Sequence, residues 1–270
     1  MLLAMFLVAA ACSSRSRPDL RIVMTTSVEP LALPAELIRA FEKETGLKVQ
    51  VQFAGTATAL EIVRRGDADG ALVHDPEQEE AFMKDGHAAS HVIVGYSEYV
   101  VLGPPGDPAR VRQATSPADA MARIAAARAE FISRGDRSGT HIFERDLWKS
   151  AKITPAGAWY LESGRGMSET LMMAMERGAY VISVLPSWLH FSAHSSYGRE
   201  HRGRLEMLYR KTPQMNNRYA FLAGREEATS APAARAAGRF SLFLTSPTAQ
   251  ELWRNHAVGG ERAFRSADNP

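Results

Sequence analysis

The sequence contains one cysteine, no apolar run long enough to span a bilayer, and no marked excess of either charge sign. Because Cys12 is the only cysteine among the 270 residues, an internal disulfide is excluded. Residues 1–11 form an apolar run, but a membrane-spanning helix needs roughly 20 such residues. The formal net charge is +2, and the basic residues are dispersed among acidic ones. This distribution argues against a nucleic-acid-binding protein.

Catalytic and metal-binding signatures are also missing from the sequence. It has no Gly-x-Ser-x-Gly elbow, no glycine-rich phosphate loop with lysine, and no paired zinc-ligand motif. His190, His194 and His201 lack carboxylate or thiolate partners at ligand spacing, so we predict no metal site and no resident cofactor. His74 and Asp75 follow an apolar run, and we interpret them as strand-end structure rather than a catalytic dyad. The sequence therefore favours a binding protein over an enzyme.

The first twelve residues differ from the rest of the chain. Residues 1–11 carry no charged side chain and end in Val8-Ala9-Ala10-Ala11 directly before Cys12. This arrangement resembles a bacterial lipoprotein signal, in which small residues precede a cysteine that is lipidated. The resemblance implies that residues 1–18 are a signal and tether, and that the protein is anchored at the periplasmic or extracellular face. The alternative is a frayed apolar N-terminus with an incidental buried cysteine.

The remainder of the chain alternates short apolar runs with helical stretches. We predict strands near residues 20–24, 47–53, 70–73, 92–94, 99–102, 131–133, 180–183, 205–209 and 219–222. We predict helices near residues 33–45, 58–65, 76–84, 117–130, 139–151, 167–177, 231–244 and 247–256. Because short buried strands separated by helices are typical of parallel βαβ units, the pattern predicts an α/β fold.

The strongest break in the chain is Gly103-Pro104-Pro105-Gly106-Asp107-Pro108. We interpret this break as the crossing between two lobes. One lobe would consist of residues 19–102 together with 216–270, and the other of residues 103–215. The chain is long enough for two lobes of this size.

The segment 131–140 carries the clearest binding signal. An apolar strand end leads through a small-residue turn into an amphipathic helix, whose first N–H groups have no intrahelical partners and carry partial positive charge. Ser138 and Thr140 add hydroxyl donors beside Gly139, and Arg134 adds a forked cation. The segment therefore predicts an anion-binding turn. The alternative is a surface Arg134 that pairs with Asp136.

Two further turns repeat this arrangement. Thr26 and Ser27 follow the first predicted strand and precede a helical pattern, and Gly55 and Thr56 follow the second strand. In doubly wound sheets ligands bind beyond the carboxyl ends of the strands, so the three turns can converge on one ligand. The hypothesis is a binder of a small oxyanion. The alternative is that these Ser and Thr residues are ordinary helix caps.

As a set, the motifs resemble those of the tungstate-binding proteins of ABC transporters, a branch of the periplasmic solute-binding proteins. The matching segments follow the family's order over most of residues 20–180: Thr25-Thr26-Ser27, Ala40-Phe41-Glu42-Lys43-Glu44-Thr45-Gly46, Gly55-Thr56, Gly66-Asp67-Ala68-Asp69, Leu72-Val73-His74, Ser133-Arg134-Gly135-Asp136, Ser138-Gly139-Thr140, Trp159-Tyr160-Leu161-Glu162 and Gly166-Met167. The resemblance implies a two-lobed type II clamshell. Each lobe would be a doubly wound, mostly parallel sheet with helices on both faces.

The resemblance also implies a function. A monomer would close around tungstate first, or molybdate second, and deliver the anion to a membrane permease. The family's ligand positions correspond here to Thr26, Ser27, Gly55, Thr56, Arg134, Ser138, Gly139 and Thr140, with Arg134 as the principal cation. Alternatives are a sensory lipoprotein that signals to a membrane partner, a phosphate or sulfate binder of the same fold, and an exported phosphoester hydrolase.

The family pattern is not matched after residue 180. Val184-Leu185-Pro186-Ser187-Trp188-Leu189 stands where the family usually carries Asp-Arg-Gly-Thr, and Met215-Asn216-Asn217-Arg218-Tyr219 does not reproduce Asn-Pro-Tyr-Gly. Arg218 is the candidate for a compensating charge in this region. The sequence does not rank the four tetrahedral anions tungstate, molybdate, phosphate and sulfate.

Overall fold

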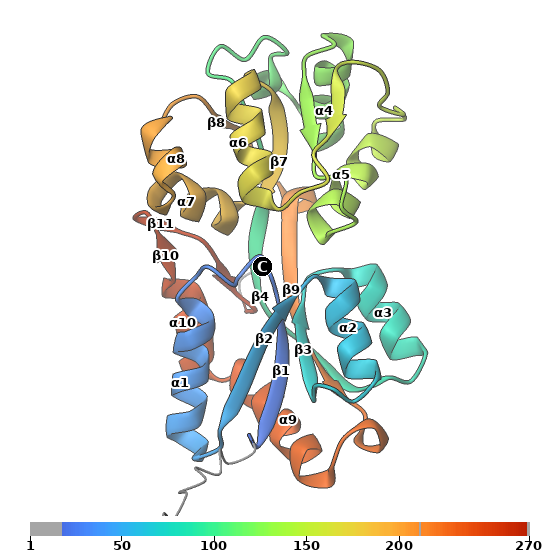
Figure 1. Cartoon of the computed structure of the whole chain (residues 1–270), viewed down its shortest axis with the longest axis vertical. Helices are drawn as coiled ribbons and strands as arrows, with labels where there is room; N and C mark the ends of the chain where they lie inside the picture. The colour runs from blue at the N-terminus through green and yellow to red at the C-terminus, as the bar shows by residue number, and fades with distance from the viewer. Residues whose placement is uncertain (1–17, 211, 269–270) are drawn as a thin grey trace, which may run out of the picture.

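Two α/β lobes lie one above the other along the long axis of the molecule (Figure 1). The structure, a computed structural model, describes residues 18–210 and 212–268. Cys12 and the predicted lipoprotein signal therefore lie outside the described residues. Among the described helices, none combines the length and the hydrophobicity that a bilayer crossing requires.

The lower lobe in Figure 1 is built around the parallel strands β2, β1 and β3, with β9 antiparallel beside β3. Its elements are β1 (Leu20–Thr25), α1 (Leu33–Thr45), β2 (Val49–Ala54), α2 (Thr56–Arg64), β3 (Gly70–Val73), α3 (Pro76–Lys84), β9 (Asn216–Gly224), η3 (Glu226–Ala228), α9 (Ala231–Leu244) and α10 (Pro247–Asn255). The short strands β10 (Ala257–Val258), β11 (Glu261–Arg262) and β12 (Arg265–Ser266) follow.

The upper lobe is built around the parallel strands β7, β5 and β6. Its elements are η1 (Val111–Gln113), α4 (Pro117–Ala126), β5 (Phe131–Ser133), α5 (Gly139–Ser150), β6 (Tyr160–Glu162), α6 (Met167–Arg177), β7 (Tyr180–Val184), α7 (Leu185–His194), α8 (Ser196–Glu200), β8 (Glu206–Tyr209) and η2 (Pro213–Met215). In both lobes most strands run parallel and alternate with helices, as the sequence pattern predicts.

Strand β4 (Ala88–Gly103) passes from one lobe into the other. It pairs with β9 as far as Glu98 and with β7 from Tyr99 onward, so its partners change in the middle of one continuous strand. The sequence predicts two separate strands here, at residues 92–94 and 99–102. The structure joins them, and the Gly/Pro break begins at Gly103, the last residue of β4, rather than at the change of partner strands.

Helices cover both faces of the sheet. One apolar core continues through both lobes and includes side chains of α1, α9 and α10 below and of α6 and α7 above. On the opposite face, α2 and α3 pack over the lower strands, and α4 and α5 pack over the upper strands. This layering confirms the predicted doubly wound architecture. It also places the carboxyl ends of β1, β2, β3 and β5 at the junction of the lobes (Figure 1).

Several helix boundaries follow from local signals in the sequence. Ser116 caps α4 by accepting a hydrogen bond from the Asp119 amide, and Pro117 occupies the first turn. Gly46 and Gly178 end α1 and α6 in the left-handed conformation that glycine tolerates best. Helix α7 was not predicted, because its sequence is apolar on several sides and shows no clear amphipathic period.

Candidate functional site

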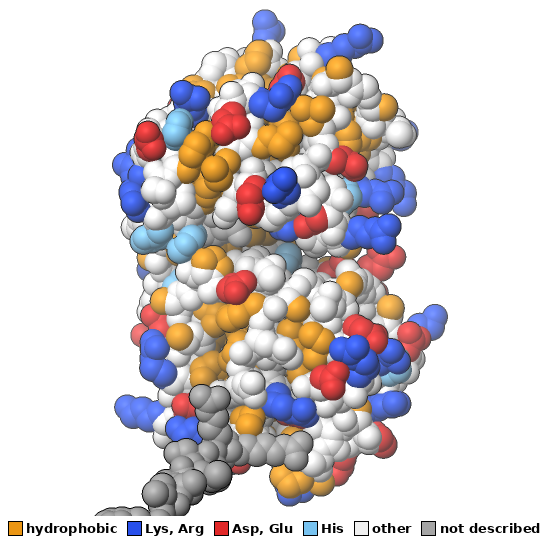
Figure 2. Space-filling view, in the orientation of Figure 1, with side chains coloured by type: hydrophobic (Ala, Val, Ile, Leu, Met, Phe, Trp, Pro, Cys, Tyr) orange, Lys and Arg blue, Asp and Glu red, His pale blue; other side chains and the backbone are white. Residues whose placement is uncertain are grey.

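A cavity of about 520 Å³ lies where the two lobes meet, and residues of both lobes line it. The eight predicted ligand residues all line this cavity: Thr26, Ser27, Gly55 and Thr56 from the lower lobe, and Arg134, Ser138, Gly139 and Thr140 from the upper lobe. Figure 2 shows the waist between the lobes, with histidine side chains gathered at one edge. The structure thus brings the three predicted turns together around one space.

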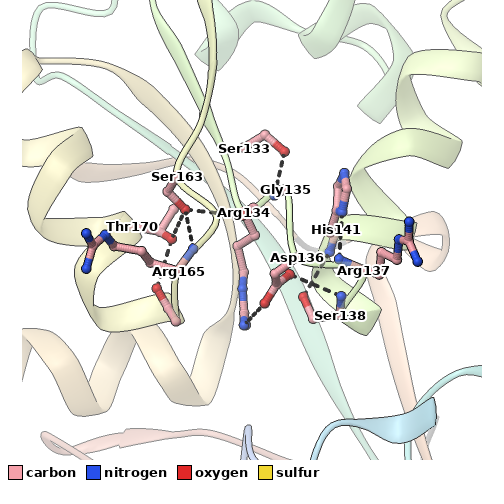
Figure 3. Close-up of polar contacts among 11 residues, drawn as sticks. Ser133, Arg134, Gly135, Asp136, Arg137, Ser138, His141, Ser163, Arg165 and Thr170 are labelled. Carbon is pink, nitrogen blue, oxygen red and sulfur yellow. Dashed lines mark hydrogen bonds and ion pairs between the residues drawn. The ribbon is translucent and has the colours of Figure 1, made fainter. Parts of the chain in front are cut away.

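Arg134 follows β5, and its backbone is held firmly on the upper lobe. The Arg134 carbonyl accepts hydrogen bonds from the Ser163 hydroxyl (3.2 Å) and the Gly164 amide (2.9 Å). Gly135 adopts a φ of 63°, and a Cβ there would lie 2.8 Å from Cβ of Glu162, so glycine is required. The Arg134 side chain extends toward the lower lobe (Figure 3).

The Arg134 guanidinium is mostly buried, with 15% of its side chain exposed. One Nη atom donates to Asp136, while Nε is buried and has no hydrogen-bond partner among the described residues. The predicted alternative, an ion pair with Asp136, is therefore present. The ion pair does not exclude a binding role, because Arg134 also lines the cavity and its Nε atom makes no hydrogen bond to the described residues.

Asp136 is ionised at neutral pH in this arrangement. Burial alone would raise the pKa of its carboxyl group, but hydrogen bonds from Ser138 and the charge of Arg134 outweigh burial, and the net pKa is lowered. The Ser138 amide donates to Asp136 at 3.1 Å. Asp136 thus connects the arginine to the first turn of α5 and fixes their relative position.

The first turn of α5 forms part of the cavity wall. Ser138 is the N-cap, and its side chain accepts a hydrogen bond from the His141 amide at 3.4 Å. Thr140 is buried in the same turn. Gly139 approaches His74 so closely that a Cβ on Gly139 would lie 2.9 Å from Cε1 of the imidazole. The first turn of α5 therefore lines the cavity with Ser138, Gly139 and Thr140, and the start of a helix is a favourable place for an anion.

The two turns of the lower lobe differ from one another. Gly55 caps α2, and Thr56 is its first residue, with a buried Oγ1 that lacks a hydrogen-bond partner among the described residues. Ser27 places its Oγ atom 3.3 Å from the hydroxyl of Tyr219. The helical pattern that follows Thr26 and Ser27 is predicted at residues 33–45, and α1 begins at Leu33 as predicted. A bend of several residues intervenes, so this first turn offers hydroxyl groups rather than helix-start amides.

His74 has a larger part in the cavity than the sequence indicates. It follows β3, is buried, lines the cavity, and places Nδ1 3.0 Å from Oδ1 of Asn217. Burial lowers the pKa of His74 to about 4, although the hydrogen bond with Asn217 acts in the opposite direction. The imidazole is therefore neutral at neutral pH. Its position at the carboxyl end of a strand beside β1 was the signal that could have marked it as a cavity residue.

The upper wall of the cavity includes a helix that sequence reasoning missed. Ser187, His190 and His194 of this helix, α7, line the cavity. Gly166 and Met167, at the start of the predicted helix α6, line it as well. The rings of His190 and His194 lie 5.0 Å apart between centroids, one helical turn from each other. Within residues 18–210 and 212–268, no group of three or more His, Cys, Asp or Glu side chains is arranged to hold a metal ion.

Arg218 does not supply the compensating charge suggested by its sequence position. Its Nη2 atom donates to Glu79 at 2.7 Å, and the residue lines a separate cavity of about 270 Å³. Among the residues that line the larger cavity, Arg134 is the one arginine, and no lysine accompanies it. Glu29 and Glu169 also line that cavity. Positive charge at the site is thus concentrated in a single guanidinium.

Comparison with known proteins agrees with this architecture. The profile of the PBP (periplasmic-binding-protein) superfamily domain matches residues 9–248, which is most of the chain. The chain belongs to the PBP superfamily. Membership accounts for the two-lobed fold and for a ligand cavity at the lobe junction.

Three known proteins are particularly similar to this chain. The tungstate-binding protein TupA of Peptoclostridium acidaminophilum is 32% identical over 242 residues, covering 88% of this chain and 82% of the relative. The solved structure of tungstate-binding TupA from Desulfovibrio alaskensis G20 has a TM-score of 0.82 and 30% identity, covering 93% of this chain and 99% of that chain. The tungstate ABC transporter structure from Geobacter sulfurreducens has a TM-score of 0.75 and 33% identity, covering 86% and 96%.

Proposed function

We propose that this protein captures a tetrahedral oxyanion for uptake by an ABC transporter. The observation that carries the proposal is the convergence of the three donor turns on one cavity. Two buried polar atoms of these turns have no hydrogen-bond partner among the described residues. These atoms are Nε of Arg134 and Oγ1 of Thr56. Because buried donors in folded proteins are nearly always paired, two donors that lack a partner among the described residues, both on residues that line one cavity, support a bound acceptor there.

The donors at the cavity suit an anion with several equivalent oxygen atoms. Hydroxyl groups of Thr26, Ser27 and Thr56 would approach from the lower lobe, and those of Ser138 and Thr140 from the upper lobe. Arg134 would add a charge-assisted hydrogen bond, which is roughly twice as strong as a neutral one. Because full coordination needs both lobes, binding would favour the closed arrangement over the open one.

Tungstate is the first candidate ligand and molybdate the second. The relatives named above support tungstate, since two of them are described as tungstate-binding proteins and one as a tungstate ABC transporter. Phosphate and sulfate are the alternative anions for the same donors. Hydrogen phosphate carries a proton that needs an acceptor, and Glu29 and Glu169 are the carboxylates available along the cavity.

The proposed partners are a membrane permease and the membrane itself, to which a lipid on Cys12 would anchor the protein. The two lobes that close around the anion would be residues 19–102 together with 216–270, and residues 103–215. The protein would act as a monomer at the periplasmic or extracellular face, and it would not be an enzyme.

Globomycin, which blocks lipoprotein signal cleavage, should leave a larger precursor in expressing cells. An unchanged band on the gel would count against lipidation.

A sensory role is the second candidate for the same ligand and the same fold. Such a protein would pass its ligand state to a signalling partner in the membrane instead of releasing the anion to a permease. Uptake of tungstate by cells with and without the protein separates these roles. Loss of uptake supports transport, whereas normal uptake with altered signalling supports sensing.

The binding proposal is tested by calorimetry on protein that begins after the predicted signal. Tungstate, molybdate, sulfate and phosphate are titrated separately and in competition. Arg134→Ala should weaken tungstate binding between about 30-fold and several thousand-fold, because truncating one partner of a buried charge pair costs about 2–5 kcal/mol. Arg165→Ala is the matched control, since Arg165 is exposed in the neighbouring turn and does not line the cavity.

Each result of this titration has a definite meaning. Tight binding of one of the four anions that is lost in Arg134→Ala and kept in Arg165→Ala supports the proposal. Equal affinities in wild type and Arg134→Ala would remove the arginine from the site. The absence of heat with all four anions would remove the function.

A further inference from the structure

Four polar side chains form a buried cluster between the cavity and the strands that connect the lobes. We name this group the hinge cluster, and it consists of His74, Ser97, Asn217 and Tyr219, which are all buried. Ser97 and Asn217 lie directly opposite one another on β4 and β9. This pair is adjacent to Glu98 and Tyr99, where β4 changes its partner strand. The cluster therefore occupies the place about which the lobes would move.

Hydrogen bonds fix the imidazole of His74 within the hinge cluster. The side-chain amide of Asn217 donates from Nδ2 to Oγ of Ser97 at 3.1 Å, which turns its Oδ1 toward His74. The imidazole is therefore the donor, from Nδ1, in its 3.0 Å hydrogen bond to Asn217. The ring of Tyr219 lies beside the imidazole, with centroids 5.3 Å apart. A ring held on these sides has little freedom to rotate or shift.

The hinge cluster contacts a donor turn of each lobe. The hydroxyl of Tyr219 lies 3.3 Å from Oγ of Ser27 in the lower lobe. The imidazole of His74 packs against Gly139 in the upper lobe, where a Cβ would lie 2.9 Å from Cε1 and 3.3 Å from Nδ1. His74 itself belongs to the lower lobe, so its contact with Gly139 joins the two lobes at the cavity wall.

We propose that His74 is a positioning residue whose imidazole, held at the hinge by Asn217, sets how closely the α5 turn of the upper lobe approaches the lower lobe. The inference rests on the proposed function, because it assigns to His74 the spacing of the donors that surround the anion. Glycine at position 139 allows backbone to approach an immobile ring, and any side chain there would hold the lobes apart. The neutral state of the imidazole at neutral pH agrees with a packing role rather than with direct anion binding.

The conformation of Gly139 makes it a clean test position. It is the first residue of α5, and it is not among the glycines with positive φ. Alanine is more favourable than glycine in a helix, so Gly139→Ala has no backbone penalty. The new methyl group would instead meet the ring of His74, which cannot move aside easily.

The experiment is a double-mutant cycle between positions 139 and 74. Gly139→Ala should weaken tungstate binding at least tenfold by calorimetry. Adding His74→Asn should restore at least half of this loss on a logarithmic scale, because asparagine keeps a donor toward Asn217 but lacks the ring that meets the methyl group. Gly238→Ala in α9 is the control, since a Cβ there has no neighbour within 4 Å, and it should leave the affinity unchanged.

A second readout keeps the inference testable without any ligand. Small-angle X-ray scattering of the ligand-free proteins should show a larger radius of gyration for Gly139→Ala than for wild type, with recovery in Gly139→Ala/His74→Asn. Urea unfolding checks that each variant is folded. Wild-type protein that binds none of the four anions would remove the proposed function, and the scattering cycle would still decide the role of His74.

Two outcomes would overturn the inference. One is a Gly139→Ala effect of the same size with and without His74→Asn, which would mean that the methyl group acts through another neighbour. The other is an unchanged radius of gyration together with unchanged affinity in Gly139→Ala. If His74 contributed to stability alone, His74→Asn would change the urea midpoint, and the effects of Gly139→Ala and His74→Asn on affinity would simply add.

Discussion

Glu144 should make the protein less stable as pH rises, and replacing it with glutamine should remove this effect. Glu144 lies on α5, the helix whose first turn faces the cavity, and it is 2% exposed. Its Oε1 atom accepts hydrogen bonds from the indole of Trp148 (3.1 Å) and the hydroxyl of Tyr160 (2.8 Å). A glutamine side-chain oxygen can accept both bonds, so the substitution removes the charge and keeps the contacts.

The magnitude follows from the pKa of Glu144. Burial raises this pKa from the ordinary value of 4.5 to about 7, and the hydrogen bonds to the carboxylate offset burial only in part. The folded state therefore keeps a proton that the unfolded state releases between these pH values. Stability from this group is fully present below pH 4.5 and is lost as pH rises through 7. At 1.36 kcal/mol per pKa unit, the loss is on the order of 3 kcal/mol.

The assay is urea unfolding of wild type and Glu144→Gln, followed by tryptophan fluorescence at pH 4.5 and pH 8.5. We expect the free energy of unfolding of Glu144→Gln, relative to wild type, to be higher at pH 8.5 than at pH 4.5 by on the order of 3 kcal/mol. Comparing the two pH values cancels any cost of the new amide that does not depend on pH. Glu200→Gln on α8 is the control, because Glu200 is exposed and its removal should change this difference by less than about 0.5 kcal/mol.

A pH-independent difference between Glu144→Gln and wild type would refute the reasoning, and so would a difference of opposite sign. Either result would mean that the carboxyl group of Glu144 ionises as easily inside the folded protein as outside it. The hydrogen bonds from Trp148 and Tyr160 would then fully compensate for burial. Equal effects in Glu144→Gln and Glu200→Gln would point to net charge rather than to the buried group.

Three further predictions concern other buried groups. Thr56→Val should weaken anion binding by about 10-fold to 150-fold in calorimetry, since a hydrogen bond to a charged group contributes about 1.5–3 kcal/mol; unchanged affinity would exclude Oγ1 from the site. Asp69→Ala should cost about 3–5 kcal/mol in urea unfolding, because buried Asp69 pairs with Arg21 at 2.6 Å; wild-type stability would show that the pair contributes nothing. The lowered pKa of His74 predicts a loss of stability as pH falls from 6.5 toward 4; His74→Asn should flatten this part of the profile, and an unchanged slope would assign it to other groups.

Elements with strong local signals were predictable from the sequence. The predicted helices at residues 167–177 and 231–244 coincide with α6 and α9. Apolar periodicity runs through both helices, Gly178 marks the end of α6, and Ser230 caps the start of α9. The apolar runs that became β2, β3 and β7 were recognisable for the same reason. The eight ligand candidates stood out because hydroxyl groups and glycines follow strands directly, which is a local pattern of the chain.

Elements that depend on distant partners were not predictable in the same way. Strand β4 looks like two strands, because Gly95 and Ser97 interrupt its apolar runs, and only pairing with β9 on one side and β7 on the other makes it continuous. Helix α7 is apolar on several sides, and its identity depends on burial against β4 and β7. The hairpin β10–β11 is too short to give a signal.

The amino-acid sequence by itself determined the kinds of donor available and the strand ends that carry them, because both depend on neighbours along the chain. Only the tertiary structure decided that these turns face one another across a single cavity. It also decided that Arg218 turns away to Glu79 and that His74 meets Gly139. These contacts join segments many residues apart, and their formation depends on packing and chain closure, which no local pattern encodes.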